Sequence, residues 1–445
     1  MTRELIAGIP LAILIIGALI TRRILEPAVF SSVVAVLMEY KTGFVGGLVE
    51  KMYQVLSNPS FQLLVIVAAG FAGLSALLEK SGAMLGFRGI LEKLCTTKKK
   101  TVFFTWLLGG IIFIDDYLNA LAVSAAMKGI SDEKRIPREH LAYTVNCMGA
   151  CVCVMLPFSS WAAFAMGCAS EQGFEASDYM HAIPFMFYPI CAIIICLLLA
   201  FEKFPLLGEL KHAYARVREG GPLLQKEAGG SGLPFGETQP SGPVYFLVPM
   251  GALIAGMLLG GKDIVIGLLA AVLCLVLMLM IGRKKKLPEL LDVFLQGASG
   301  MMPMLITIFI TFIMETAIDE MGFIEFLTGL ISRTIPAWLV PVTAFVLVGG
   351  ITFFAASFWT LIVISFPIFL PMAAAAGVNP AMVIGAVMSG VALGSQACLY
   401  SDAIFMVAAG TSVPNDTQFR TVLPYTAIGA VAASVLFIAA GLLIR

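Results

Sequence analysis

Two adjacent carboxylates, Asp115 and Asp116, lie in the middle of a long apolar stretch. Fourteen uncharged residues separate Lys100 from Asp115, and eleven separate Asp116 from Lys128. A helix that begins at Thr101 and rises 1.5 Å per residue covers ~20 Å before it meets this pair. An acidic side chain at that depth in a bilayer costs ~2.5–3.5 kcal/mol. The pair therefore predicts a site that binds cations or protons.

A third carboxylate, Asp402, has a similar setting in the second half of the chain. Between Arg333 and Arg420 the only charged residues are Asp402 and Asp416, and Asp402 lies within an interrupted apolar stretch. Glu315 ends another apolar stretch, where it is either a ligand or a residue at the outer interface. These positions extend the predicted site to both halves of the sequence.

Polar residues and helix breakers interrupt the apolar stretches near all three aspartates. The interruptions are Pro157–Trp161, Ala355–Thr360 and Gly394–Asp402. Unwound backbone at membrane depth is tolerated only where it is buried in protein or lines a cavity, and there its oxygens suit a small cation. We expect the ion- or substrate-binding residues to be Asp115, Asp116, Asn119, Asn146, Ser159, Ser160, Ser357, Thr360, Ser401 and Asp402. Of these, Asp115, Asp116 and Asp402 are the predicted Na+ ligands.

The composition places this site in a membrane protein. Of the 445 residues, 59% are hydrophobic and 13% are charged, and the mean hydropathy is +0.96. A soluble domain carries roughly a quarter charged residues. Lys plus Arg and Asp plus Glu both number 28, so no net charge points to a nucleic-acid partner. The sequence predicts an all-α, polytopic protein in contact with the lipid bilayer.

Full membrane spans are predicted from apolar stretches long enough for a ~30 Å hydrocarbon core. They lie near residues 5–20, 26–38, 61–79, 182–201, 243–260, 264–281, 298–316 and 421–443. Regions 101–168 and 338–409 are long and apolar but interrupted. With an outer amino terminus and 101–127 as a hairpin that returns to its side of entry, 22 of the 28 basic residues face the cytoplasm, as the positive-inside rule requires.

An internal repeat relates the two interrupted regions. Leu107-Leu-Gly-Gly-Ile-Ile-Phe113 matches Leu347-Val-Gly-Gly-Ile-Thr-Phe353 at an offset of 240 residues, and Ser160 falls against Ser401 when one gap is allowed. The number of intervening spans predicts that the second copy is inverted. Inverted repeats with broken helices are typical of secondary transporters.

The resulting fold has about ten transmembrane helices plus two re-entrant hairpins. The predicted domains are an N-terminal scaffold (1–60), a first repeat (61–201) with hairpin 101–127 and broken helix 141–168, a cytoplasmic linker (202–242), connecting scaffold spans (243–297), and a second repeat (298–445) with an outer hairpin 338–373 and broken helix 380–409.

Three motifs resemble the NhaC-type sodium/proton antiporter family. They are Phe113-Ile-Asp-Asp-Tyr-Leu-Asn-Ala-Leu121, Arg138-Glu-His-Leu-Ala-Tyr143 and Pro157-Phe-Ser-Ser-Trp161, and the Ser401-Asp402 break is similar to the second half of that family. The resemblance covers about residues 60–440. It implies inverted repeats, a scaffold domain and a mobile transport domain, a homodimer, the cytoplasmic (inner) membrane, and site residues Asp115, Asp116, Asn119, Ser159, Ser160 and Asp402.

The function predicted from these features is Na+/H+ exchange by alternating access, without a cofactor. Two close carboxylates cannot both ionise at low cost, so Na+ and protons should compete for them. The main alternative is Na+- or H+-coupled transport of a small organic anion or amino acid, because related families exchange malate for lactate.

Two other classes of protein fit the sequence less well. An intramembrane aspartyl protease also needs two buried aspartates, but it needs a glycine-rich motif before the second one. A soft-metal exporter could use Cys147, Cys151 and Cys153, yet cysteines in apolar stretches commonly pack as small hydrophobic side chains. The sequence therefore predicts a transporter and not an enzyme.

Overall fold

The computed structural model describes residues 6–21, 25–82, 88–225, 241–260, 263–283, 285–322, 335–355, 358–399 and 401–444. Every regular element in these ranges is a helix. Helices of the first half are α2 (Ile9–Thr21), α3 (Leu25–Tyr40), α4 (Phe44–Ser57), α5 (Pro59–Ser81), α6 (Arg88–Leu94), α7 (Lys98–Ile111), α8 (Asp116–Glu133), α9 (Arg138–Met155), α10 (Ser160–Glu171), α11 (Ala176–Ala182) and α12 (Phe187–Ala200).

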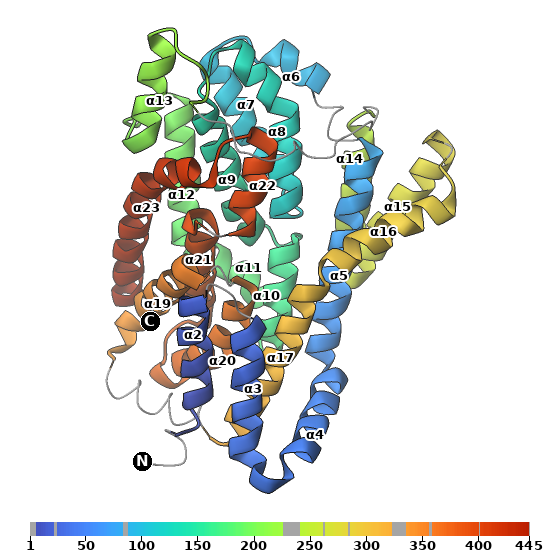
Figure 1. Cartoon of the computed structure of the whole chain (residues 1–445), viewed down its shortest axis with the longest axis vertical. Helices are drawn as coiled ribbons and strands as arrows, with labels where there is room; N and C mark the ends of the chain where they lie inside the picture. The colour runs from blue at the N-terminus through green and yellow to red at the C-terminus, as the bar shows by residue number, and fades with distance from the viewer. Residues whose placement is uncertain are drawn as a thin grey trace.

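The second half has the same all-helical character. Its helices are α13 (Gly208–Arg218), α14 (Val244–Leu259), α15 (Ile264–Arg283), α16 (Leu287–Gly300), α17 (Met302–Glu320), α19 (Val340–Ala355), α20 (Phe358–Ala376), α21 (Pro380–Ala397), α22 (Asp402–Thr411) and α23 (Asn415–Leu443). Figure 1 shows α6, α7 and α13 at one end of the molecule and α4 at the other.

Several helical stretches are long and apolar enough to cross a membrane. Within the described residues, five meet this test alone, and up to seven do so if each of two bent helix pairs counts as one span. The five are Leu25–Ser57, Arg138–Glu171, Ile264–Gly282, Pro380–Ala397 and Asn415–Leu443. The predicted all-helical membrane architecture is confirmed, whereas the count of about ten spans and the domain boundaries stay predictions.

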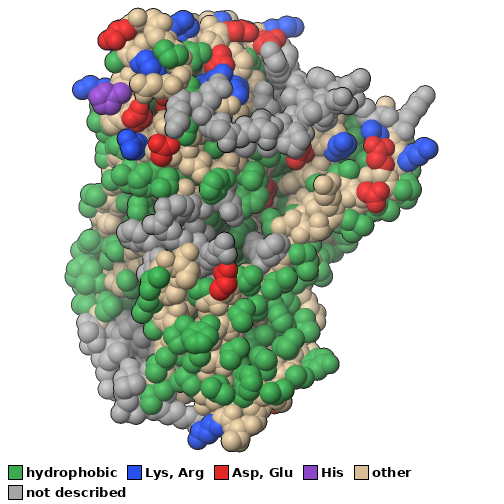
Figure 2. All heavy atoms as spheres, in the orientation of Figure 1, with side chains coloured by type: hydrophobic (Ala, Val, Ile, Leu, Met, Phe, Trp, Pro, Cys, Tyr) green, Lys and Arg blue, Asp and Glu red, His purple; other side chains and the backbone are tan. Residues whose placement is uncertain are grey.

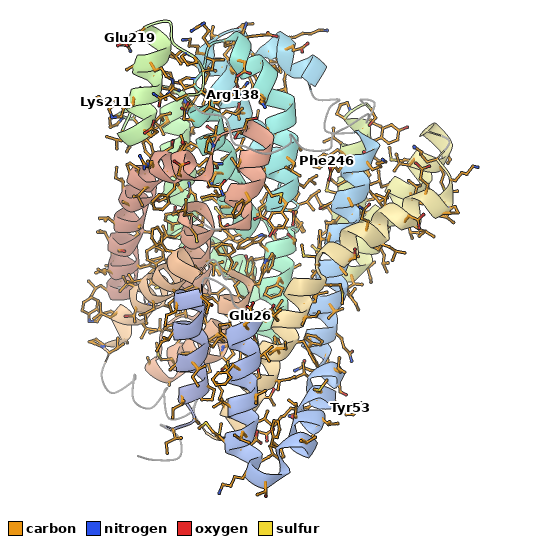
Figure 3. All side chains as sticks on the ribbon, in the orientation of Figure 1. Glu26, Tyr53, Arg138, Lys211, Glu219 and Phe246 are labelled. Carbon is orange, nitrogen blue, oxygen red and sulfur yellow. The ribbon has the colours of Figure 1, made fainter. Side chains whose placement is uncertain are left out.

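The surface separates charged from apolar side chains along the length of the molecule. Charged side chains gather at the end formed by α6, α7 and α13, and hydrophobic side chains dominate the visible middle and lower surface (Figure 2). Arg138, Lys211 and Glu219 lie at the charged end, and Tyr53 lies near the opposite end (Figure 3). This distribution fits a bilayer around the apolar part.

Two groups of four helices share one spacing along the chain. Helices α7, α8, α9 and α10 begin at residues 98, 116, 138 and 160, and helices α19, α20, α21 and α22 begin at 340, 358, 380 and 402. Each start in the second group follows its counterpart by 242 residues. In both groups an unwound stretch separates the last two helices. We call α7–α10 the first unit and α19–α22 the second unit.

The spacing of 242 residues changes one detail of the repeat proposed from the sequence. It aligns Ser159, the N-cap of α10, with Ser401, the N-cap of α22. The sequence match instead placed Ser160 against Ser401. Short motif identity could not fix this register, because it contains no information about where each helix begins.

The two units pack across each other. Helices α8 and α22 run in the same direction: a Cβ added to Gly410 of α22 would lie 2.6 Å from the Ser124 side chain of α8, and further along Lys128 Nζ donates to Ser412 Oγ at 2.8 Å. The starts of α10 and α20 meet through Trp161 and Trp359, whose ring centroids are 4.8 Å apart. Thus α10 of the first unit packs on α20 of the second unit, and α22 of the second unit packs on α8 of the first.

Helices α5, α14, α15 and α16 form an arm that leans away from these units (Figure 1). Helices α5 and α16 approach so closely that a Cβ at Gly297 would lie 2.5 Å from the carbonyl oxygen of Ala72. Only glycine fits such an approach without displacement of the backbone. Within the arm, α16 is therefore joined to α5 by close contact between the two backbones.

The predicted linker 202–242 contains an ordered helix, α13, and its residues 226–240 lie outside the described ranges. Arg216 of α13 forms an ion pair with the buried Glu139 of α9 at 2.7 Å. Burial raises the pKa of the Tyr214 hydroxyl above its ordinary value, which keeps it protonated 2.7 Å from His140 Nδ1. The connector is thus bound to the charged end of α9.

Candidate functional site

The connection between α7 and α8 holds both adjacent carboxylates. Asp115 is the N-cap of α8, and its Oδ1 accepts hydrogen bonds from the backbone N–H groups of Tyr117 at 3.0 Å and Leu118 at 3.2 Å. Asp116 is the first residue of the helix, and both aspartates are only 4% exposed. An aspartate at an N-cap satisfies amides that a helix start leaves unpaired. The local sequence therefore folds so that two carboxylates meet at a helix start.

The break between α9 and α10 lies directly against this pair. Ser160 Oγ donates to Asp115 Oδ2 at 3.1 Å, and Trp161 Nε1 donates to Asp116 Oδ1 at 3.1 Å. The Ser160 N–H also donates to the Ile114 carbonyl at 2.8 Å. The start of α10 therefore supplies one neutral donor to each carboxylate.

Ser159 has a structural position within the same break. It is the N-cap of α10, and its hydroxyl accepts the Ala162 N–H at 3.0 Å and donates to the carbonyl of Cys153. These bonds join the end of α9 to the start of α10. Ser159 thus fixes the shape of the break, while Ser160 contacts the carboxylate.

The two predicted asparagines differ in what they contact. Asn119 Nδ2 donates to the carbonyls of Gly109 at 2.7 Å and Ile112 at 2.5 Å, so it ties α8 to the end of α7. Its Oδ1 is buried without a hydrogen-bond partner. Asn146 of α9 is 2% exposed, and both of its amide atoms are buried without a partner. Neither side chain is hydrogen-bonded to the aspartate pair.

The second unit brings its own helix starts to this region. Ser401 caps α22 by accepting the Ile404 N–H at 3.2 Å, and Asp402 is the first residue of that helix. Thr360 lies in the first turn of α20. Ser357 lies outside the described residues, so its predicted role stays a prediction.

Four helix N-termini therefore converge in the interior. Helices α8 and α22 leave toward the charged end and α10 and α20 leave toward the other end (Figure 1). Each helix start carries a partial positive charge that favours a nearby carboxylate by ~0.3–1 kcal/mol, and by up to ~2 kcal/mol where burial is favourable.

Trp161 is a site residue that the sequence prediction missed. Its indole N–H contacts Asp116, and its ring packs against Phe358, with centroids 6.0 Å apart, and against Trp359. It stands at the end of the Pro157–Trp161 motif, directly after two predicted site residues. The available signal was a tryptophan within an interrupted apolar stretch, because a buried indole N–H normally finds an acceptor.

A cavity of about 220 Å³ reaches Asp115 from the arm side. Asp115 and Tyr117 line it from the first unit, and Ser75 and Glu79 line it from α5. Gly300, at the end of α16, closes another side. Asp115 is therefore buried but adjoins a space large enough for a small ion.

The three cysteines Cys147, Cys151 and Cys153 lie in the buried interior. The described residues contain no group of three or more His, Cys, Asp or Glu side chains placed to hold a metal ion. Cys147 and Cys151 are fully buried and make weak contacts to the Ala192 carbonyl and to Gln396 Oε1. Their surroundings fit the interpretation of cysteine as a packing residue.

Comparison with known proteins finds sequence similarity in the second half of the chain. Residues 234–442 match the family described as the Na+/H+ antiporter family. An uncharacterized protein of Haemophilus influenzae is 25% identical over 474 aligned positions, which cover 97% of this chain and 90% of the relative.

Two solved structures share the fold at low sequence identity. The YdaH transporter of Alcanivorax borkumensis superposes with a TM-score of 0.61 at 14% identity, covering 88% of this chain and 87% of that one. MtrF of Neisseria gonorrhoeae, described as illuminating a class of antimetabolite efflux pumps, gives a TM-score of 0.57 at 13% identity, covering 89% and 83%. The family match together with the shared fold supports a secondary transporter; the NhaC subtype stays a prediction.

Proposed function

We propose that this protein exchanges Na+ for protons across the membrane, with both ions competing for the carboxylates of Asp115 and Asp116. The observation that carries the proposal is the position of these two adjacent, buried acids at the meeting point of four helix starts. The match to the Na+/H+ antiporter family supports it.

The energetics favour a bound cation or proton at the pair. Two ionised aspartates at bilayer depth cost ~5–7 kcal/mol in total on insertion scales. The helix starts and the neutral donors Ser160 and Trp161 recover part of this cost, because charge-assisted hydrogen bonds contribute ~1.5–3 kcal/mol each. Mutual repulsion of two neighbouring charges adds a further penalty. One positive charge therefore stabilises the pair, and either Na+ or a proton supplies it.

The two aspartates have different roles in this mechanism. Asp115 accepts two backbone N–H groups and the Ser160 hydroxyl, so its position is fixed by the fold. Asp116 follows the cap as the first residue of α8, so its protonation leaves the cap of the helix intact. We therefore assign the gain and loss of a proton, as Na+ leaves and enters, to Asp116.

Alternating access completes the proposal. The cavity beside Asp115 and Glu79 provides one route to the pair, and movement of the two units against the scaffold would provide the other. We place the charged end of the molecule in the cytoplasm and the protein in the cytoplasmic membrane as a homodimer, in keeping with the positive-inside rule and with the family resemblance.

The direct test replaces Asp116 by Asn in proteoliposomes. Asp116→Asn keeps the size of the side chain but removes the exchangeable charge, so Na+-dependent proton flux should disappear. Glu133→Gln, at the exposed end of the same helix α8, is the matched control and should retain normal flux. Normal exchange by Asp116→Asn would refute the assignment.

A second candidate function is cation-coupled transport of a small organic anion. The converging helix starts attract anions as well as acidic side chains, and MtrF, which shares the fold, is described with antimetabolite efflux pumps. In this case the carboxylates would bind the coupling ion. Uptake of a labelled dicarboxylate driven by a Na+ gradient would favour this function over ion exchange alone.

A further inference from the structure

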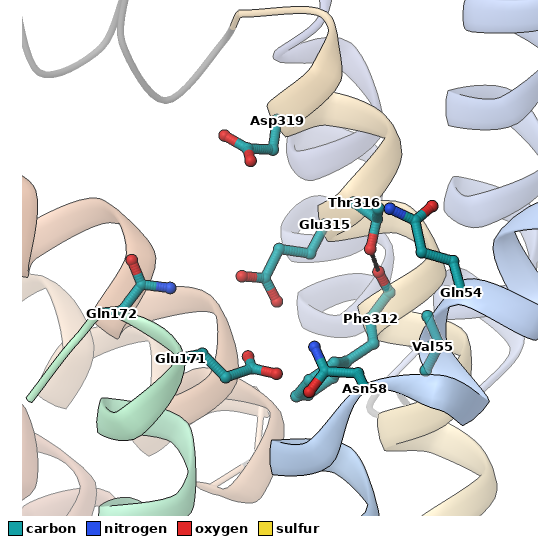
Figure 4. Close-up of a pocket in the computed structure, with 9 residues that line it drawn as sticks. All are labelled: Gln54, Val55, Asn58, Glu171, Gln172, Phe312, Glu315, Thr316 and Asp319. Carbon is teal, nitrogen blue, oxygen red and sulfur yellow. Dashed lines mark hydrogen bonds between the residues drawn. The ribbon is translucent and has the colours of Figure 1, made fainter.

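A second group of acidic residues lines a cavity far along α10 from the aspartate pair. The cavity has a volume of about 210 Å³ and lies between the end of α10, the end of α4 and the last turns of α17. Its acidic side chains are Glu171 of α10 and Glu315 and Asp319 of α17. Figure 4 shows Glu171 and Glu315 extending from opposite walls into the same space.

Two carboxylate oxygens in this cavity are enclosed by protein without a hydrogen-bond partner. They are Glu315 Oε2 and Glu171 Oε1, each with almost no accessible surface. Neutral side chains also line this wall: Asn58 lies beside Glu171, and Thr316 donates its hydroxyl to the Phe312 carbonyl at 2.8 Å. Enclosed carboxylate oxygens without donors are costly unless a positive ion or proton binds them.

The helix geometry adds negative potential to the same place. Glu171 is the last residue of α10, so the cavity lies at the carbonyl end of a helix whose other end contacts Asp115 and Asp116. A helix C-terminus carries a partial negative charge and favours cations. The remaining polar lining comes from Gln54 and Gln172, which offer amide oxygens suited to a hard cation.

The lysine on the adjoining helix α4 is engaged elsewhere. Lys51 is fully buried and bonds to Glu320 at 2.6 Å and Glu39 at 3.2 Å. The described residues that line the cavity include neither Lys nor Arg. Glu171 and Glu315 supply two carboxylates to this space, and one bound positive charge, from a monovalent cation or a proton, reduces the cost of enclosing them.

We propose that Glu171 and Glu315 form a second binding site for a monovalent cation, Na+ or a proton, which joins the end of α10 to α17. This second site extends the proposed Na+/H+ exchange, because α10 connects it to the aspartate pair. The proposal for the second site rests on the proposed exchange only for the identity of the ions. A cation held there clamps α10 to α17, and its release frees α10 to move.

The test measures binding to the full chain in nanodiscs with Asp116→Asn as the background, so that the central pair contributes less. Saturable binding of radioactive Na+ to this variant should weaken by at least about tenfold when Glu315→Gln or Glu171→Gln is added, since each removes a charged ligand. Glu50→Gln, an exposed acid on α4, is the matched control and should bind Na+ as the background does.

A proton titration of the same variants distinguishes the two ions. If the site takes only protons, the Glu315→Gln chain should bind about one proton fewer, with no dependence on Na+. If Glu315→Gln does not fold, Glu315→Asp replaces it in both measurements: it keeps the charge but shortens the side chain, so Na+ binding or proton uptake at this site should still weaken. Unchanged Na+ binding together with unchanged proton uptake in the glutamine variants would overturn the second site, whatever the flux of Asp116→Asn shows about the first.

Discussion

The two units have the same helix order but different chemistry at their centres. In the first unit, the residues at the start of α8 are Asp115 and Asp116; 242 positions later, the second unit has Ser357 and Phe358. The same spacing places Asp402 opposite Ser160. The first unit thus carries paired acids on its hairpin, and the second carries its acid on the short helix.

This difference shows how one backbone plan can support unequal roles. The helix starts create the same partial positive charge in both units, irrespective of side chains. Acidic residues stand at the starts of α8 and α22, and aromatic residues stand at the starts of α10 and α20. In the proposed mechanism the first unit therefore supplies most of the ion-binding chemistry, and in the structure the rings of Trp359 and Phe358 pack against Trp161.

The largest expected effect is on Na+-dependent proton flux, when Asp116 of the first unit and Asp402 of the second unit are replaced in turn. Asp116→Asn should abolish Na+-dependent proton flux, whereas Asp402→Asn should leave about a tenth of it, a loss of ~1.4 kcal/mol. The reason is that Asp402 adds a charge at the start of α22 but has no acid next to it in the sequence, whereas Asp115 and Asp116 are adjacent. Flux in proteoliposomes at matched protein density measures both. Equal losses would show that the two units contribute alike.

Helix packing offers the next comparison. A Cβ at Gly390 of α21 would lie 2.8 Å from the Gly349 backbone nitrogen and 2.9 Å from the Phe345 carbonyl oxygen. At Gly149 of α9 the nearest atom, the Asp116 carbonyl oxygen, is 3.5 Å away.

Gly390→Ala should therefore lower the free energy of unfolding by about 1–3 kcal/mol, as overpacking does. Gly149→Ala should change it by less than about 0.5 kcal/mol. Unfolding by SDS titration in mixed micelles measures both variants. A tolerated alanine at Gly390 would mean that α19 and α21 can separate without loss.

The two tryptophans at the meeting point test which contact carries function. Trp161→Phe keeps an aromatic ring but removes the hydrogen bond to Asp116, so flux should fall about tenfold. Trp359 contacts Trp161 and Phe164 through its ring, and Trp359→Phe should reduce flux by no more than about twofold. Na+ affinity and maximal flux should be recorded separately. The reverse ranking would assign the donor role to Trp359.

Much of the site could be predicted from the sequence because its signal was chemical. Charged residues are so rare between Lys100 and Lys128 that Asp115 and Asp116 stand out, and the Pro157–Trp161 motif marks a break. That these two features would meet in space followed only from the family resemblance. The structure joins them through Ser160 and Trp161.

The remaining features depend on distances that no sequence pattern contains. The cavity at Glu171 and Glu315 joins residues 144 positions apart along the chain. Glu315 alone resembled a residue at the end of a span. Asn119 resembled a ligand, but it mainly ties α8 to the end of α7, since an amide can satisfy carbonyls as readily as it can bind an ion.

The smallest expected effect concerns the equivalent caps Ser159 and Ser401. Each hydroxyl accepts one backbone N–H, and removal of a serine cap costs about 1 kcal/mol of helix stability. Ser159 also donates to the Cys153 carbonyl, so Ser159→Ala should destabilise the protein by about 0.5–1 kcal/mol more than Ser401→Ala. Thermal unfolding in detergent, with and without Na+, measures the difference. If the two variants are equally stable, the extra bond in the first unit does not contribute, and its break is no more rigid than the break in the second.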